Sequence, residues 1–227
     1  MTTSGTHTFE PNFAEIFDEA WERIGRDPAS IGLQEVVSAQ RSLNLLLTSD
    51  LSQGFSNLWK AEEYSTTPAV DATSFALPAG AIDVLYALTR LNGYDTPMTP
   101  LGAIEWQEIP NKTPQMGSRP DRYWVERLRA TRTFHFWNPQ PTPQYTIVLR
   151  VLYALEDAGD LTNTPDVPER WMEVVCAGLA ARLAVKYAPD RLGMLRGEFM
   201  AARKEAESSN RERTSIFFMP DNAGWRR

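Results

Sequence analysis

The spacing of apolar residues changes its period twice along this chain, and this constrains the fold more than any other feature. Between about residues 13 and 51, apolar residues recur every three or four positions, as in amphipathic helices. Between about residues 57 and 155 the period approaches two, as in half-buried strands. Helical spacing returns between about residues 168 and 206. The sequence therefore predicts an α+β protein in which a β block interrupts a helical region.

Two helices are predicted in the first region. Asn12 precedes the first, Gly25 and Pro28 follow it, and its apolar face consists of Phe13, Ile16, Phe17, Ala20, Trp21 and Ile24. The second helix is expected from about Leu33 to Leu51, with an apolar stripe of Leu33, Val36, Val37, Leu43, Leu46 and Leu47. The short turn between them predicts an αα-hairpin.

The β block shows alternation in several short runs. The clearest run is Tyr145, Ile147, Leu149, Val151 and Tyr153, and further strands are expected near residues 82–89, 123–127 and 133–137. Asn92-Gly93 predicts a hairpin turn, because both residues tolerate a positive φ. Residues 101–109, between two prolines, are expected to form a short helix. Several short strands separated by prolines predict an antiparallel sandwich or a barrel-like lobe.

The last region contains a second predicted helical hairpin. Asp166 is expected to cap a helix from about Pro168 to Tyr187, with Glu169 completing a capping box. Gly178 stands among alanines, which predicts a close approach of two helices. The next helix begins after Pro189 and turns Leu192, Leu195, Phe199, Ala202 and Ala206 inward. Since neither hairpin can leave its apolar face in water, we expect the four helices to pack as one bundle.

These elements divide the chain into four parts. Residues 1–55 form the N-terminal helical hairpin, which packs with residues 166–210 as the helical domain. Residues 56–155 form the β insertion lobe, and residues 156–210 comprise an acidic connector and the C-terminal hairpin. Residues 211–227 form an extended arm.

Catalytic patterns are absent from the sequence. The chain has one cysteine, Cys176, and two histidines, and it contains no phosphate-binding, nucleophile-elbow or zinc-protease motif. His135 reads as a half-buried strand histidine and Cys176 as an inert core residue. The carboxylate pair Glu105 and Glu108 reads as solvated surface. We therefore expect no catalytic, cofactor-binding or metal-binding residues, no cofactor and no enzyme activity. We also expect no signal peptide and no membrane-spanning segment.

The arm differs from the rest of the chain in charge and in aromatic content. The whole chain carries a net charge of −6, whereas the residues from Arg203 onward carry six basic and four acidic side chains, which leaves −8 on the remainder. Tails that stay disordered are usually poor in aromatic residues. The arm is therefore expected to bind a partner protein, although packing on its own core, plain disorder and nucleic-acid binding stay open. Its binding residues are predicted to be Arg211, Arg213, Ile216, Phe217, Phe218, Trp225, Arg226 and Arg227.

The ordered layout resembles the head-to-tail adaptor proteins of tailed bacteriophages, which in short-tailed phages are also called tail accessory factors or gatekeepers. The resemblance covers about residues 10–210. It is carried by FAEIFDEAWERIG (13–25), VVSAQRSLNLLL (36–47), NLWKAEE (57–63), SFALPAGAIDVLYALTR (74–90), PNKTPQMGSRPDRYWVERL (110–128), FHFWNPQPTPQYTIVLRVLYALEDAGD (134–160) and DVPERWMEVVCAGLAARLAVKYAPDRL (166–192).

This resemblance implies a virion protein at the capsid–tail junction, assembled in the host cytoplasm. It implies a ring, typically of twelve copies, beneath the portal protein, with the arm clasping the portal and the β lobe directed towards tail tube, nozzle or fibre proteins. DNA would pass through the channel without specific binding, and an acidic body suits such a channel. Two alternatives stay open: a cell-wall hydrolase using Glu105 or Glu108, and a head-completion protein that contacts DNA.

Overall fold

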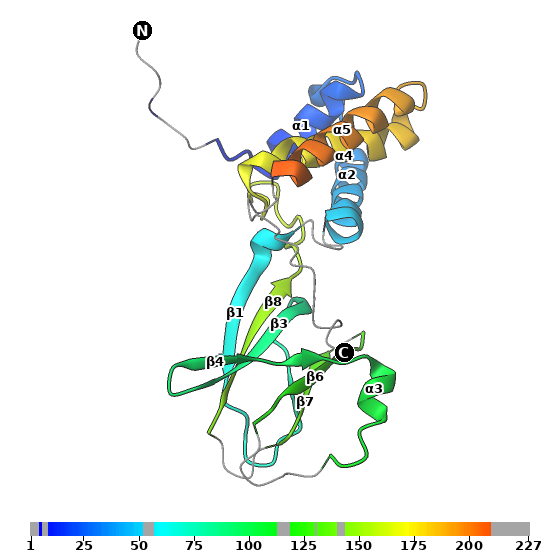
Figure 1. The fold of residues 1–227 in the computed structure, drawn as a ribbon. Helices are drawn as coiled ribbons and strands as arrows, with labels where there is room; N and C mark the ends of the chain where they lie inside the picture. The colour runs from blue at the N-terminus through cyan, green and yellow to red at the C-terminus, as the bar shows by residue number, and fades with distance from the viewer. Residues whose placement is uncertain are drawn as a thin grey trace, which may run out of the picture.

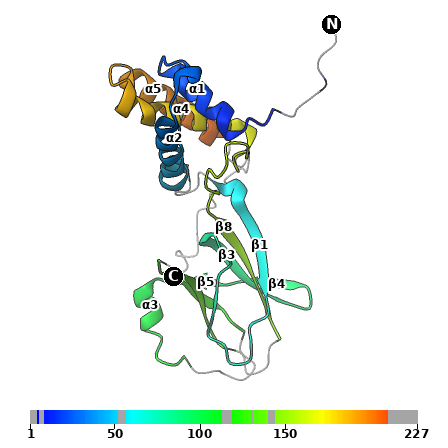
Figure 2. The same cartoon turned by 180° about the vertical axis from the view of Figure 1, so that it is seen from behind.

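The chain folds into a helical region at one end and a β region at the other (Figures 1 and 2). The structure is a computed structural model that describes residues 5, 9–51, 57–112, 119–129, 131–139 and 144–209. The predicted α+β class is confirmed, with helices before and after two four-stranded sheets. Each region has its own cluster of buried apolar side chains.

Helix α4 lies at the centre of the helical region. The region contains α1 (Phe13–Arg23), α2 (Leu33–Leu46), α4 (Glu169–Tyr187) and α5 (Leu192–Ser209), and α4 contacts each of the other three. Residues 174–181 of α4 are all buried, so this helix is apolar on every side. Short helical turns form η1 (Pro28–Ser30) between α1 and α2, η2 (Leu47–Leu51) directly after α2, and η3 (Leu58–Lys60) just before β1.

Gly178 explains how closely the helices approach one another. A Cβ atom at this position would lie 2.9 Å from the side chains of both Leu46 on α2 and Phe199 on α5. The predicted close approach at Gly178 is confirmed, and it is a three-helix contact.

Two expectations for the helical region need correction. The predicted apolar stripe of α2 is confirmed for Leu43 and Leu46, which are buried against α4, but its first members, Leu33 and Val37, are 84% and 47% exposed. Contact between α1 and α2 is also slight, since each of them packs on α4.

The helix starts differ in how they are capped. At α1, the Asn12 side chain accepts from the Glu15 amide at 3.0 Å, and the Glu15 carboxylate accepts from the Asn12 amide at 2.9 Å. The predicted cap of α4 by Asp166 is wrong, because Pro168 occupies the N-cap position without a side-chain hydrogen bond. Asp166 instead pairs with Lys60 at 2.5 Å, at the junction with the β region.

The β region consists of two sheets packed around a shared core. One sheet has the order β1 (Ala61–Thr66), β8 (Thr146–Tyr153), β3 (Ala81–Leu91) and β4 (Tyr94–Pro97). The other has the order β2 (Ser74–Ala76), β7 (Arg132–Trp137), β6 (Arg122–Arg127) and β5 (Thr99–Pro100). All pairs are antiparallel except β5 with β6. Residues from both sheets, among them Phe134, Phe136, Ile147 and Leu149, form the core between them.

Strand β3 departs from simple alternation. The predicted turn at Asn92-Gly93 is confirmed, with φ values of 50° and 81°. However, register shifts at residues 81–83 and 84–86 change which side chains face inward, so Val84 and Ala87 are buried while Tyr86 is exposed. A bulge adds one residue to a strand and reverses the alternation beyond it.

The two regions are joined through β1 and β8 (Figure 1). Trp59, just before β1, lies 5.0 Å from Trp171 of α4 between ring centroids. Leu155 and Ala158, just after β8, belong to the helical core. The Asn57 side-chain amide donates to the Tyr153 carbonyl at 2.8 Å, so the two connections are held side by side.

Candidate functional site

The arm predicted to bind a partner follows the described part of α5. The structure describes α5 up to Ser209, and the proposed binding residues lie outside the described residues: Arg211, Arg213, Ile216, Phe217, Phe218, Trp225, Arg226 and Arg227. The surfaces that the structure does describe lie on the β region and on the helices.

The outer face of β6 and β7 carries a ladder of aromatic and charged side chains. Because alternate residues of each strand face opposite sides, Tyr123, Phe134 and Phe136 enter the core and their neighbours face outward. Trp124 pairs with His135 across the strands, with ring centroids 5.0 Å apart. Arg122 pairs with Trp137, and its guanidinium lies 5.1 Å from the indole centroid, within the range of a cation–π contact.

Helix α3 (Ala103–Gln107) covers part of this ladder. Its Trp106 is buried and stacks on Trp124 at 6.2 Å, and it lies 5.8 Å from the His135 ring. The predicted short helix in residues 101–109 is thus confirmed. Its start is fixed by Glu105, whose carboxylate accepts from the Gly102 amide at 2.7 Å. The ladder and α3 together form an aromatic layer outside the sheet.

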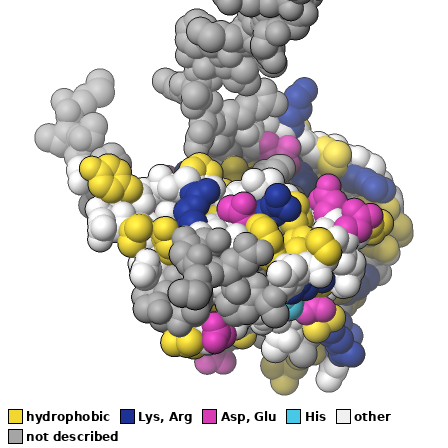
Figure 3. Space-filling model, turned by 60° about the horizontal axis from the view of Figure 1, so that its bottom comes forward, with side chains coloured by type: hydrophobic (Ala, Val, Ile, Leu, Met, Phe, Trp, Pro, Cys, Tyr) yellow, Lys and Arg dark blue, Asp and Glu magenta, His cyan; other side chains and the backbone are white. Residues whose placement is uncertain are grey.

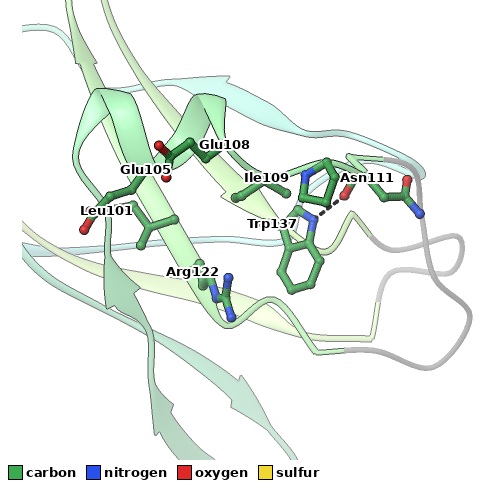
Figure 4. Close-up of a pocket in the computed structure, with 8 residues that line it drawn as sticks. Leu101, Glu105, Glu108, Ile109, Asn111, Arg122 and Trp137 are labelled. Carbon is green, nitrogen blue, oxygen red and sulfur yellow. Dashed lines mark hydrogen bonds between the residues drawn. The ribbon is translucent and has the colours of Figure 1, made fainter.

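A pocket of about 500 Å³ opens between α3 and the ladder (Figure 4). Glu105 and Glu108 project from the α3 side, whereas Arg122 and Trp137 come from the strands. The Trp137 indole nitrogen donates to the Asn111 carbonyl at 2.7 Å, which fixes one wall. The described lining residues are Leu101, Glu105, Glu108, Ile109, Pro110, Asn111, Arg122 and Trp137. Hydrophobic, basic and acidic side chains also stand next to one another on the described part of this end of the molecule (Figure 3).

Sequence reasoning did not identify this pocket as a unit. It placed Glu105 and Glu108 on solvated surface, which is confirmed because both are exposed, and both also lie in the wall of this open pocket. The signal was the run Phe134, His135, Phe136 and Trp137, in which aromatic residues occupy both faces of one strand. A strand with large side chains on both faces is covered on both faces, here by the core and by α3.

His135 and Cys176 lie where the sequence predicts, at a half-buried strand position and in the helical core. His135 is 21% exposed, and its Nε2 lies 3.1 Å from the Glu126 carboxylate on the neighbouring strand. Cys176 is buried in α4, and burial raises the pKa of its thiol to about 11. Since thiolates are the reactive form of cysteine, this thiol is inert at neutral pH in the folded protein.

Neither a metal-binding cluster nor a membrane-spanning helix is found among the described residues. Among the described residues, no three His, Cys, Asp or Glu side chains come together as a metal site. No helix within the described ranges is long and apolar enough to cross a bilayer.

Most of the chain is similar to one known protein family. The model of the family described as SU10 adaptor protein matches residues 11–222. The chain belongs to the SU10 adaptor protein family. This is a phage head-to-tail adaptor family, so the resemblance seen in the sequence is confirmed. No match was found among curated proteins.

The family match covers nearly the whole chain. It spans the helical region, the β region and the first part of the arm, including Arg211, Arg213 and Phe217. Trp225, Arg226 and Arg227 lie beyond it. Membership in an adaptor family suggests a non-enzymatic virion component at the head–tail junction, with portal and tail proteins as partners.

Proposed function

We propose that this protein is a connector that assembles as a ring beneath the portal, extends the DNA channel and provides the attachment site for tail components. The family match over residues 11–222 is the observation that carries this proposal. The expected ring has twelve copies and assembles on the portal in the host cytoplasm. DNA passes through the ring during ejection without specific binding.

In such a ring, the helical region and the β region have different roles. The helices form the ring wall, and residues 56–155 act as an insertion lobe that reaches the next tail component. Only β1 and β8 lead into this lobe from the helices, and Trp59 and Lys60 hold the junction. A lobe held at one end can project from a wall while the four helices pack around their own core.

Charge supports the passage of DNA. The residues before Arg203 carry a net charge of −8, so a channel built from them repels phosphate and does not displace the counterions that surround DNA. DNA can therefore slide through the channel without binding to its wall. The arm has the opposite sign of net charge, which suits a separate docking role.

The arm, residues 211–227, is the proposed portal-binding segment. It combines arginine with Phe217, Phe218 and Trp225, and arginine and aromatic residues are enriched at binding hot spots. The charged and aromatic residues act together as a strap that continues from α5, which ends at Ser209.

A truncation tests this function. A chain ending at Asn210 keeps every described helix and strand, so its circular dichroism and melting temperature are expected to match the full chain. Co-sedimentation with the portal ring of the same phage is expected to be lost. The matched control replaces residues 211–227 by a Gly/Ser segment of equal length. Portal binding by either variant at the level of the full chain would contradict the proposal.

A further inference from the structure

The helical region carries two charged surfaces of opposite sign on opposite sides of α4. The first is the outer face of α1, where Glu15, Asp18, Glu19 and Glu22 are all exposed. Glu15 is engaged in the α1 capping box and Glu19 pairs with Arg23 at 2.7 Å. Asp18 and Glu22 stand one turn apart and project from the same face. We call this surface the acidic face.

The second surface is a groove between α4 and α5. It has a volume of about 240 Å³, and its described lining consists of Gly178, Ala181, Arg182, Val185, Leu192, Arg196 and Phe199. The lining is apolar apart from two arginines, and no acidic side chain is among these described residues. Val185 is 62% exposed, which is high for a valine on the helix at the centre of the region. We call this surface the basic groove.

Helix geometry places the two surfaces back to back. α1 packs on the side of α4 that bears Glu173 and Tyr187, through the Arg23–Glu173 ion pair at 2.6 Å and the Trp21–Tyr187 ring contact at 5.1 Å. With 3.6 residues per turn, Tyr187 and Val185 point about 160° apart around the axis of α4. A copy that offers its acidic face to a neighbour therefore offers its basic groove in the opposite direction.

Two different, complementary surfaces facing opposite ways form a head-to-tail contact. Repetition of such a contact builds a ring when the rotation between copies closes, whereas a self-complementary contact stops at a dimer. Arg196 is exposed, whereas Arg182 is half-buried and its guanidinium donates to the Ser49 hydroxyl at 2.8 Å. The carboxylates of Asp18 and Glu22 can pair with these two arginines across the contact, and exclusion of water from Val185 and Phe199 adds apolar burial. Charged rims of this kind also set the register of a contact.

We propose that the acidic face of one copy docks in the basic groove of the next copy, and that this contact joins the subunits of the ring. This inference rests on the proposed ring and identifies the surfaces that build it. Asp18 and Glu22 on α1, and Arg182 and Arg196 on α4 and α5, are its charged partners.

Charge reversal tests the contact in both directions. One variant carries Asp18→Lys and Glu22→Lys, and the other carries Arg182→Glu and Arg196→Glu. Each variant alone is expected to reduce ring formation on the portal at least tenfold, because like charges then face each other. Mixing the two variants, or combining all four changes in one chain, is expected to restore rings, measured by native mass spectrometry. A matched control, Glu62→Lys with Glu63→Lys at two exposed positions of β1, is expected to assemble as the unchanged chain does.

A disulfide ladder tests the head-to-tail geometry independently. A chain with Glu22→Cys and Arg196→Cys is expected to give covalent trimers and longer species when oxidised on the portal, and each single-cysteine variant is expected to give at most dimers. Cys176 is buried and does not compete.

The outcomes separate the two levels of the proposal. Full ring formation by both charge variants, or a ladder that stops at dimers, would overturn the interface and leave the connector function standing. Melting temperatures within a few degrees of the unchanged chain show that any loss of rings is not a folding defect. An unchanged chain that binds no portal and forms no ring would overturn the connector function, and the interface with it.

Discussion

The helical region and the β region bury their aromatic residues in different ways. Trp171 lies fully buried at the centre of the helices, on a helix that is apolar on every side. The large indoles of the β region lie on the outer face of a sheet. Trp106 stacks on Trp124 there, and Trp137 lines the open pocket. The difference indicates that the helices form a tightly packed frame, whereas the β region also places aromatic side chains on the outer face of a sheet.

The largest effect is expected at Trp171. Trp171→Ala leaves a cavity beside Trp59 and is expected to destabilise the protein by about 3–5 kcal/mol, the usual cost for a buried tryptophan. Trp137→Ala, on the outer face of β7, is expected to cost about 1 kcal/mol, because it loses one cation–π contact and one hydrogen bond. Denaturant unfolding measures both. Equal losses would contradict the contrast between frame and surface.

Gly178 tests how tightly the frame is packed. Gly178→Val places methyl groups against Leu46 and Phe199 and is expected to destabilise the fold by about 1–3 kcal/mol or more. Gly197 on α5 is the matched control, since nothing lies within 4 Å of an added Cβ there. Gly197→Ala is expected to stabilise the protein by roughly 0.5–1 kcal/mol, because alanine is the better helix former. A thermal melt of each variant gives the answer, and loss of stability at both sites would count against close packing as the cause.

The cysteine tests whether the frame opens on its own. Because burial raises the pKa of Cys176 to about 11, the folded state favours the neutral thiol. The stability that this contributes is complete below pH 9 and is lost as the pH rises from about 9 to about 11. At pH 8 a thiol reagent is expected to label Cys176 only at the rate of unfolding, followed by mass spectrometry. Labelling at the rate of a free thiol in the native protein would contradict the burial of this helix face.

The smallest effect is expected from a surface ion pair of the β region. Arg127 reaches Asp83 through two contacts of 2.8 and 2.9 Å, but 64% of its side chain is exposed. Arg127→Ala is expected to change stability by about 0–1 kcal/mol, the usual range for exposed pairs, and the loss is expected to shrink at high salt, because salt screens exposed charges. Chemical denaturation at low and at high salt measures it, and a loss above about 2 kcal/mol would show that this pair stabilises the β region more than an exposed pair does.

Much of the fold could be predicted because local patterns decided it. The period of apolar residues located α1, α4, α5 and β8, and Asn92-Gly93 located the turn after β3. The prediction failed where tertiary contacts chose between local options. α2 has apolar residues on two sides, and only the position of α4 decides that Leu43 is buried and Leu33 is not. Asp166 matches a capping pattern, but Lys60 from the other region draws it away.

The candidate surfaces were predictable to a smaller extent. The arm stays a prediction from composition, because it lies outside the described residues. The pocket beneath α3 joins residues from positions 101 to 137, and the basic groove depends on the crossing of α4 and α5. Such surfaces arise from packing, which no short pattern records.

We propose that this chain is a ring-forming connector whose helical region builds the ring wall. Native mass spectrometry of the chain alone, and mixed with the portal ring of its own phage, is the decisive test. We expect a species of 25.6 kDa alone and a complex with twelve added copies in the mixture. A chain that stays at 25.6 kDa beside an unoccupied portal ring would contradict it.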